Sequence, residues 1–202
     1  MKIYYSAASP YVRKCMVVAY ELGLAERIEK LPSAANPITR DQTIVVNNPL
    51  GKVPTFFSDD GMVLYDSRVI CEYLNEIGKG TLLPKSGPKH WQVLTEQSLG
   101  DGILDAALLM RYEDAMRPEA SRWLAWSNGQ MEKVQSGLTQ IDADCGNWAG
   151  AVDIGKIALG CALGYLDFRF AHVDWRAAYP NATRWFAAFN GRPSMQATLP
   201  KA

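Results

Sequence analysis

The pattern of apolar and polar positions near the N-terminus predicts short strands separated by an amphipathic helix. A β-prone run over residues 2–5 comes first. Ser9-Pro10 then begins a helix, because Ser is a preferred N-cap and Pro suits the first helical position. Apolar residues follow at i, i+3, i+4 and i+7 spacing until Gly23, which suits the position that ends a helix. A weaker β-prone run over residues 27–31 predicts a second strand, parallel to the first.

The next segment predicts a hairpin and a second helix. Residues 32–48 show no firm period and are expected to form a loop with at most one short helix. Two β-prone runs then flank the sequence Asp-Asp-Gly at residues 59–61, which supplies the positive φ that a tight turn needs. A helix follows from Asp66 or Ser67 to about Gly78. The order βαβ, ββ and α is that of a small α/β sandwich.

The rest of the chain predicts helices only. Residues 79–88 are rich in Gly, Pro and Lys and are typical of a linker. The expected helices cover residues 89–116, 119–143, 153–171 and 180–189. The third is apolar around most of its circumference, so we expect it to be central and buried. We therefore predict an α/β plus all-α protein, with one domain over residues 1–78 and an all-helical domain over residues 89–202.

The charge balance excludes several classes of partner. The chain has 202 residues, 21 Lys plus Arg and 21 Asp plus Glu, and 48% apolar residues. Zero net charge argues against a protein that binds nucleic acid mainly through an excess of positive charge. It also argues against a polybasic membrane anchor. No stretch approaches the roughly 18 apolar residues of a membrane-spanning helix, and the N-terminus lacks the apolar run of a signal peptide. We expect a cytoplasmic protein that binds neither nucleic acid nor a membrane.

The cysteines and histidines predict no metal site. The chain has four Cys and two His residues, and none of them forms a close-spaced ligand pair. Cys15 lies on the apolar face of the first predicted helix and is expected to be structural, as are Cys71 and Cys161. Cys145 lies in the loop-like sequence DADCGNW and is expected to be exposed.

Three local features are candidates for chemistry, and each also has a plainer explanation. Ser9 lies at a helix N-terminus directly after a strand, where unpaired N–H groups and the helix dipole favour an anion. N-capping alone would explain a serine there. Val53-Pro54 precedes a strand, where proline is common because it has no N–H to pair within the sheet. Asp66-Ser67 precedes a helix and is also typical of an N-cap pair.

The order of these features along the chain resembles the glutathione transferase superfamily. The segments SPYVRK, NPLGKVP and LYDSRVICEYL carry the resemblance, which spans nearly the whole chain and is closest to bacterial members with a serine in the first motif. The later GYLDFR and GRPSM segments fit as well. The resemblance implies a thioredoxin-like domain followed by an all-helical domain. It also implies a symmetric homodimer.

The same resemblance implies roles for particular residues. Ser9 matches the position beside the glutathione sulfur. Val53 matches the residue whose backbone pairs with the cysteinyl part of glutathione, and Pro54 matches the family's cis-proline. Lys52 lies where several classes place a basic or amide side chain near the glycyl carboxylate.

Further candidates follow for the two ends of the site. Asp66 and Ser67 match the acidic-Ser pair that holds the γ-glutamyl end, and a helix N-terminus suits a carboxylate there. Tyr11 in the first predicted helix, with Met110 and Tyr112 in the helix after the linker, are candidates for the second-substrate pocket. Such a pocket is expected between the domains.

Serine at position 9 bears on the chemistry, because it cannot form the mixed disulfide that cysteine forms. A free thiol has a pKa near 8.5, so only about 3% is thiolate at pH 7. Lowering that pKa by about two units requires about 2.7 kcal/mol, which one charge-assisted hydrogen bond and a helix N-terminus can supply.

The resemblance therefore implies a glutathione transferase, with glutathione as co-substrate and no metal. Its thiolate would attack a hydrophobic electrophile in the cleft between the domains. A glutathione-dependent peroxidase, an isomerase and a non-catalytic binding or regulatory protein remain open alternatives.

Basic residues occur at unusual positions in two of the predicted helices. The predicted buried helix begins with Asp153, and Lys156 stands where the family has an acid, so the reciprocal capping box is absent. A lysine in the first turn also opposes the helix dipole. Arg13 and Lys14 are expected on a solvated or interface face of their helix.

Overall fold

The computed structural model describes residues 1–148, 150 and 152–201, and it divides into two compact units. One unit holds Met1–His90 together with the C-terminal residues from Pro193 on, and the other holds Trp91–Arg192. The prediction placed those C-terminal residues in the helical domain of residues 89–202. The difference arises because the last short helix packs against the first long one. Ala202, at the end of the predicted domain, lies outside the described residues.

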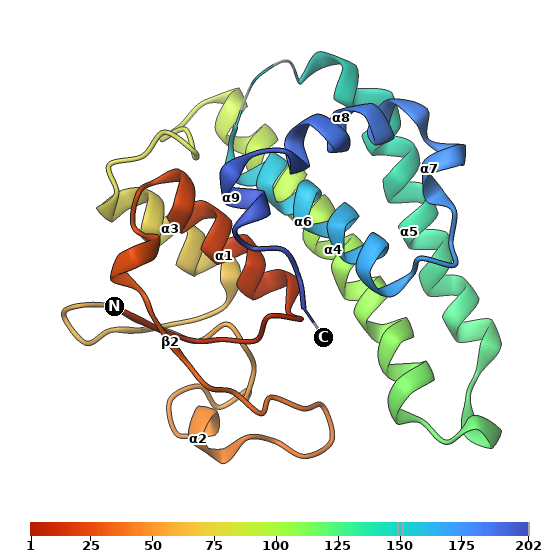
Figure 1. The fold of residues 1–202 in the computed structure, drawn as a ribbon, viewed down its shortest axis with the longest axis horizontal. Coiled ribbons are helices and arrows are strands. Elements are labelled where there is room, and N and C mark those ends of the chain that lie inside the picture. The colour runs from red at the N-terminus through yellow and green to blue at the C-terminus, as the bar shows by residue number, and fades with distance from the viewer. Residues whose placement is uncertain (149, 151, 202) are drawn as a thin grey trace. The chain divides into compact units, whose positions relative to one another are not determined.

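The first unit is a four-stranded sheet with helices (Figure 1). Its elements are β1 (Lys2–Tyr4), α1 (Pro10–Glu21), the 3₁₀ turn η1 (Ala25–Arg27), β2 (Glu29–Leu31), α2 (Gln42–Val45), β3 (Phe56–Phe57), β4 (Val63–Leu64), α3 (Ser67–Ile77) and α9 (Pro193–Gln196). The strand order is β2-β1-β3-β4, with β1 parallel to β2 and the other neighbours antiparallel. The predicted βαβ-ββα thioredoxin-like order is confirmed, and the predicted short helix in the loop is α2.

The core of this unit lies between the sheet and the two helices α1 and α3, which pack against each other. Ile3 and Phe56 are fully buried on the sheet. Val12 and Cys15 are buried on α1, and Ile70 on α3. Val12 and Cys15 belong to the apolar face that the spacing after Pro10 predicted. Burying such stripes is what stabilises short strands that cannot be stable alone.

The polar residues on α1 correct one expectation. Arg13 and Lys14 are both buried, so they do not form a solvated face of the helix. The Nη2 atom of Arg13 donates to the main-chain oxygen of Met195 at 3.2 Å, so α9 covers this part of α1. A pattern read along one helix could not reveal a partner 182 residues away.

The second unit contains helices only among its described residues. Its elements are α4 (Pro88–Met116, of which the first residues belong to the first unit), η2 (Glu119–Ser121), α5 (Leu124–Asp144), η3 (Cys145–Asn147), α6 (Ile154–Arg169), α7 (Trp175–Ala178) and α8 (Pro180–Asn190). The helix expected over residues 119–143 instead begins at Leu124, after a 3₁₀ turn. The four-residue helices α7 and α9 were not predicted, because they are too short to show a period.

The centre of this unit is α6, as the sequence predicted. Residues on all its sides are buried, Cys161 among them. Gly100 lets α4 pack closely against it, because a Cβ atom there would lie 2.7 Å from the carbonyl carbon of Ala158. Cys145, expected to be exposed, is buried at the end of α5 because η3 folds back beneath α8.

The start of α6 shows how the missing capping box is replaced. Asp153 caps the helix through its Oδ1 atom, which accepts from the Lys156 main-chain N–H at 2.9 Å. The Lys156 ammonium group is buried, lies 3.2 Å from Asp153 Oδ2 and pairs with Glu96 of α4. The lysine therefore ties the helix start to α4, at the expense of an unfavourable position in the helix dipole.

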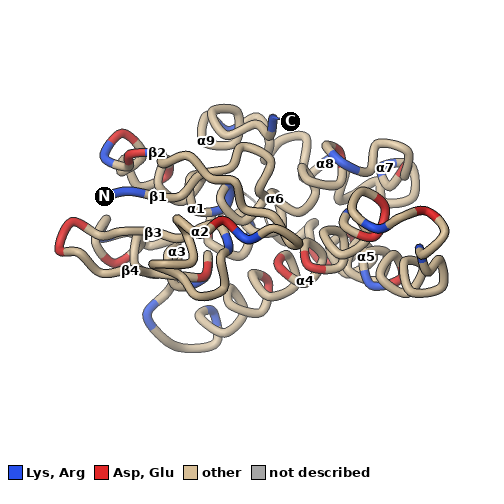
Figure 2. Tube along the Cα trace, turned by 90° about the horizontal axis from the view of Figure 1, so that it is seen from below, with Lys and Arg blue, Asp and Glu red and all other residues tan. Residues whose placement is uncertain are grey.

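Charge is mixed throughout the molecule. Figure 2 shows basic and acidic residues scattered along both units. Within the part of the chain that the structure describes, no helix is long and apolar enough to span a bilayer. Among the same residues, no group of three or more His, Cys, Asp or Glu side chains is placed to hold a metal ion.

Candidate functional site

Three strand ends of the first unit meet at one edge of the sheet. Ile3 of β1 lies opposite Phe56 of β3, and Phe56 lies opposite Leu64 of β4, both pairs antiparallel. The main-chain N–H of Tyr4 donates to the Thr55 oxygen at 2.9 Å and extends the β1–β3 pairing. The C-terminal ends of β1 and β4 therefore flank the N-terminal end of β3. Each of the three motifs found in the sequence adjoins one of these ends.

Ser9 follows β1 and begins α1. Its Oγ atom accepts a hydrogen bond from the Val12 main-chain N–H at 3.3 Å, so the N-cap explanation is correct. The residue is half-buried, and accepting this bond does not use the hydroxyl proton. The same side chain can therefore cap the helix and donate to a ligand.

Lys52, Val53 and Pro54 precede β3. The Val53–Pro54 peptide bond is cis, as the resemblance implied. Val53 is half-buried, and no described residue forms a hydrogen bond with its main-chain N–H or C=O. Lys52 is exposed, and no described carboxylate lies within ion-pair distance of its ammonium group. This segment thus presents main-chain groups and a positive charge to a ligand.

Asn48 holds the Lys52–Pro54 segment in place. Its side chain is 1% exposed. The Nδ2 atom donates to Thr55 Oγ1 at 2.9 Å and to the Lys52 oxygen at 3.4 Å. The Thr55 hydroxyl in turn donates to the Lys52 oxygen at 2.8 Å. In the sequence, Asn48 begins the NPLGKVP segment, but no role was assigned to it, because an Asn-Pro pair is ordinary in a turn.

Asp66 and Ser67 follow β4 and begin α3. Asp66 is exposed and caps the helix through Oδ1, which accepts from the Arg68 main-chain N–H at 2.9 Å. Ser67 is 2% exposed, yet its hydroxyl has no hydrogen-bond partner among the described residues. The Cys15 thiol lies 3.8 Å from the Ser67 main-chain oxygen, so a structural cysteine of α1 packs against this helix start.

The electrostatics of this edge suit a ligand that carries both signs of charge. The N-termini of α1 and α3 both lie here, and each carries a partial positive charge from the helix dipole. The ammonium group of Lys52 adds a full positive charge. The Asp66 carboxylate, which lies 3.9 Å from the Arg68 guanidinium, supplies a negative charge at the start of α3. The edge can therefore stabilise carboxylates and a thiolate as well as an ammonium group.

Comparison with known proteins identifies the family. The profile described as "Glutathione S-transferase, N-terminal domain" matches residues 8–77, and the corresponding C-terminal domain profile matches residues 124–188. The uncharacterized GST-like protein YibF of Escherichia coli K12 is 32% identical over 205 aligned residues, which cover 99% of this chain and 98% of YibF. The chain belongs to the glutathione S-transferase family.

Solved structures of this family superpose closely on the chain. A glutathione transferase family member from Pseudomonas fluorescens Pf-5 with bound glutathione is 41% identical, with a TM-score of 0.96 over 100% of this chain and 99% of that one. A glutathione S-transferase from Methylobacillus flagellatus KT with glutathione bound is 36% identical, with a TM-score of 0.89 over 99% of both chains. These family members establish the fold of both units.

The second-substrate candidates are divided between the two units of this family member. Tyr11 is half-buried in the first turn of α1, in the first unit. Met110 is buried on α4 in the second unit, and Tyr112 is half-buried two residues later. Burial raises the pKa of the Tyr112 hydroxyl above its ordinary value, so this residue stays a neutral hydrogen-bond donor near pH 7.

Proposed function

We propose that the chain is a glutathione transferase that holds the glutathione thiolate against Ser9 for attack on a hydrophobic electrophile. The observation that carries the proposal is the meeting of three groups at one sheet edge: the Ser9 hydroxyl, the Val53 main chain, which no described residue pairs, and the Asp66-Ser67 helix start. Two family members at 41% and 36% identity hold glutathione, which supports the choice of ligand.

The charges of glutathione complement these residues. Its γ-glutamyl end carries an ammonium group and a carboxylate, which match the Asp66 carboxylate and the Ser67 hydroxyl at the α3 N-terminus. The main-chain N–H and C=O of Val53 suit the peptide groups of the cysteinyl residue. Lys52 suits the glycyl carboxylate. Each charge of the tripeptide thus has a partner of opposite sign or a hydrogen-bonding group.

Ser9 acts on the thiol without ionising. Its hydroxyl group donates a hydrogen bond to the sulfur. This hydrogen bond is stronger to a thiolate than to a neutral thiol. A charge-assisted hydrogen bond contributes about 1.5–3 kcal/mol and a helix N-terminus about 0.3–1 kcal/mol. Together they can lower the thiol pKa by about two units, since one unit corresponds to about 1.4 kcal/mol. Glutathione supplies the nucleophile, so Ser9 needs no partner base.

Replacing Ser9 tests this role directly. In Ser9→Ala, the pKa of the bound glutathione thiol is expected to rise by about one to two pH units, because the donor is lost. Titrating the ultraviolet absorbance of the bound thiolate against pH measures that pKa. An unchanged pKa would remove Ser9 from the mechanism, and a wild-type protein that does not bind glutathione in calorimetry would overturn the whole proposal.

Two further variants separate the donor from the helix cap. Ser9→Gly also lacks the hydroxyl, but glycine as an N-cap costs only a few tenths of a kcal/mol. Ser9→Thr keeps both the cap and the donor. We expect Ser9→Gly to behave like Ser9→Ala in the thiol titration, and Ser9→Thr to keep the low pKa.

A substrate panel tests the type of reaction. Thioether formation from aryl halides is the outcome expected of a transferase. Oxidised glutathione formed from an organic hydroperoxide, without any conjugate of the aryl halides, would instead assign a peroxidase.

A further inference from the structure

The helices α4 and α6 of the second unit lie side by side and run in the same direction (Figure 1). A Cβ atom on Gly155, at the start of α6, would lie 2.8 Å from the Val93 oxygen of α4. Further along both helices, Gly100 of α4 approaches Ala158 of α6. Because each helix rises by about 1.5 Å per residue, the same register continues toward their C-terminal ends. It brings residues 107–112 of α4 beside residues 165–169 of α6.

Four polar side chains come together at this end of the helix pair, and we call them the α4–α6 cluster. Arg111 and Tyr112 come from α4. Tyr165 and Arg169 come from α6, where they lie one turn apart on the same face. The two guanidinium groups and the Tyr112 hydroxyl all act electrostatically on the Tyr165 hydroxyl. This coupling agrees with the helix register, so the four side chains are neighbours.

The Tyr165 hydroxyl is an unused hydrogen-bond donor on a buried side chain. Tyr165 is 3% exposed, and its ring centroid lies 6.4 Å from that of Phe170. Buried tyrosines usually pair their hydroxyl groups, but this one has no hydrogen-bond partner among the described residues. Its oxygen is not sealed from solvent either, so a ligand can reach it. Burial raises the pKa of Tyr165 and of Tyr112, which therefore both stay neutral donors near pH 7.

The two arginines of the α4–α6 cluster carry positive charge that no described carboxylate neutralises. Arg111 and Arg169 are half-buried, and neither forms an ion pair with a described residue. The Arg169 guanidinium lies over the Phe168 ring, 4.0 Å from its centroid. This contact holds the group while its N–H groups remain free to donate. Two guanidinium forks and two phenolic hydroxyls are donors that suit a carboxylate.

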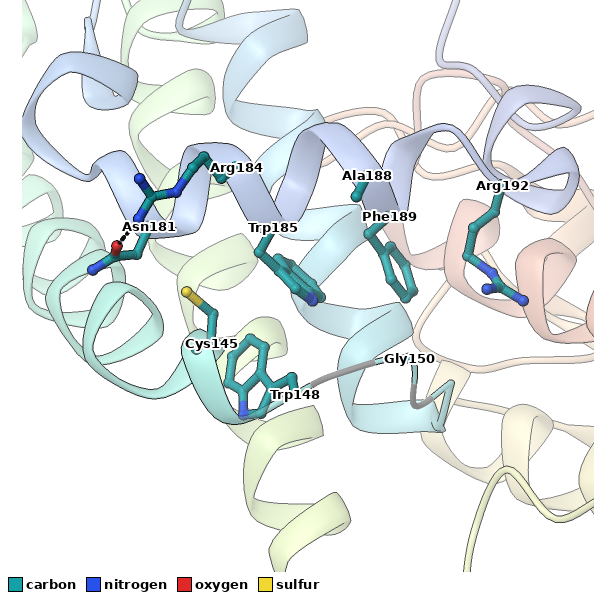
Figure 3. A pocket seen from close by; sticks show the side chains of 10 residues that line it. Cys145, Trp148, Gly150, Asn181, Arg184, Trp185, Ala188, Phe189 and Arg192 are labelled. Carbon is teal, nitrogen blue, oxygen red and sulfur yellow. Dashed lines mark hydrogen bonds between the residues drawn. The ribbon is translucent and has the colours of Figure 1, made fainter.

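The pocket between α8 and the turn η3 does not offer such a pair of arginines. Arg184 and Arg192 line it at opposite ends (Figure 3). Arg184 donates to the side-chain oxygen of Asn181 on the same helix, and Arg192 lies over the Phe189 ring, 5.9 Å from its centroid. These two guanidinium groups do not converge on one small ligand. The α4–α6 cluster is therefore the better-suited anion site of the second unit.

We propose that the α4–α6 cluster binds a carboxylate of the electrophile, so that the enzyme acts on electrophiles with an apolar body and a carboxylate at one end. The proposal rests on the proposed function and on the expectation that Tyr112 lines the second-substrate pocket. With a benzylic halide, the glutathione sulfur forms a bond to the benzylic carbon while the carbon–halogen bond breaks and halide leaves. The carboxylate does not react, and its binding orients the carbon that does.

Calorimetry with two synthetic conjugates tests this proposal on the full-length protein. S-(4-carboxybenzyl)glutathione carries the carboxylate, and S-(4-carbamoylbenzyl)glutathione has a neutral amide of similar shape in its place. We expect the carboxylate conjugate to bind about tenfold more tightly. Arg111→Gln and Arg169→Gln should each remove most of this preference. Tyr165→Phe, which keeps the buried ring, should reduce it about threefold. Arg122→Gln, at an exposed arginine outside the α4–α6 cluster, should keep the full preference.

A titration with glutathione alone separates this proposal from the proposed function. A wild-type protein that binds neither glutathione nor the conjugates would overturn both. Binding of glutathione with equal affinity for the two conjugates would overturn the carboxylate site only, as would a preference that survives in both arginine variants. Thermal unfolding followed by circular dichroism shows which variants are folded. If one arginine variant does not fold, the other arginine variant and Tyr165→Phe decide.

Discussion

At the scale of single residues, a site made of main-chain groups depends on the side chains that hold the main chain. Val53 would bind its ligand through N–H and C=O groups, which its own side chain does not determine. Asn48 and Thr55 fix this segment through three hydrogen bonds that converge on Lys52 and on each other. Asn48 is thus a positioning residue that touches no substrate in the proposed site.

Replacing Asn48 should therefore affect glutathione binding more than chemistry. In Asn48→Ala, the KM for glutathione is expected to rise about tenfold with kcat little changed, because the binding segment loses its buried anchor. Steady-state kinetics at varied glutathione measure both constants. The adjacent Asn47→Ala is the matched control, since the Asn47 side chain donates to the Thr43 oxygen of α2 instead. A large fall in kcat at unchanged KM would contradict the positioning role.

At the scale of elements, helices here begin where a side chain meets their first N–H groups, and that side chain need not be local. Ser9, Asp66 and Asp153 cap their own helices, and each start was predicted from the sequence. The N-cap of α5 is Trp123, which has no capping side chain. Glu113 of α4 supplies the missing acceptor, because its Oε1 atom accepts from the Trp123 N–H at 2.7 Å. This remote cap explains why the start of α5 was placed too early.

The Glu113 contacts make the stability of the second unit depend on pH. The bond from Trp123, and then the Arg117 guanidinium, hold the pKa of Glu113 below its ordinary value of 4.5. The unfolded chain then binds more protons than the folded one, so the contribution of Glu113 is fully present above pH 4.5 and is lost as pH falls through its folded pKa. Glu113→Gln should lower the free energy of unfolding at pH 7. Below pH 4.5 the free energies of unfolding of the variant and the wild type should come closer together.

Urea unfolding at a series of pH values measures this difference. Glu132→Gln is a suitable control, because Glu132 is exposed on α5 and no described residue pairs with it. The free energy of unfolding of Glu132→Gln should equal that of the wild type at every pH. If Glu113→Gln lowers the free energy of unfolding by the same amount at every pH down to 3, the carboxylate charge is not what stabilises the start of α5.

At the scale of the whole molecule, the end of the chain returns to the unit in which it began. The Ser194 hydroxyl donates to Glu21 at the end of α1. The Thr198 hydroxyl donates to the Ser194 oxygen at 2.8 Å, and the Lys201 N–H donates to the Ala7 oxygen at 3.3 Å. Ala7 lies two residues before Ser9. The C-terminal segment therefore braces the loop that leads to the proposed thiolate-binding serine.

Deleting residues 197–202 should loosen this loop. Amide hydrogen exchange is expected to quicken over residues 7–13, because the Lys201 hydrogen bond and the Thr198 contacts are lost. Exchange in α6 of the other unit should not change. Lys201→Ala keeps the main-chain donor, so its amide hydrogen exchange over residues 7–13 should match that of the wild type. Equal exchange over residues 7–13 in the truncated and full-length proteins would show that the segment does not brace the loop.

The same distinction between local and remote contacts separates what the sequence could predict from what it could not. The helix start at Ser9, the turn at Gly61 and the buried α6 were predictable, because each rests on neighbouring residues. The burial of Arg13 beneath α9 and of Cys145 beneath α8 was not, because each partner is far along the chain. The candidate site shows the same division: its motif residues were found, whereas Asn48, which only holds them, was missed.

The burial of the cysteines has a consequence for the proposed activation of a glutathione thiol. Reactive electrophiles alkylate any accessible thiolate, and oxidised glutathione forms mixed disulfides with exposed cysteines. All four cysteines of this chain are at most 6% exposed and unbonded to one another. On the proposed function, the protein binds reactive electrophiles while its own thiols stay buried and out of their reach. It can thus turn over repeatedly without self-inactivation, since the sulfur that reacts leaves with the product.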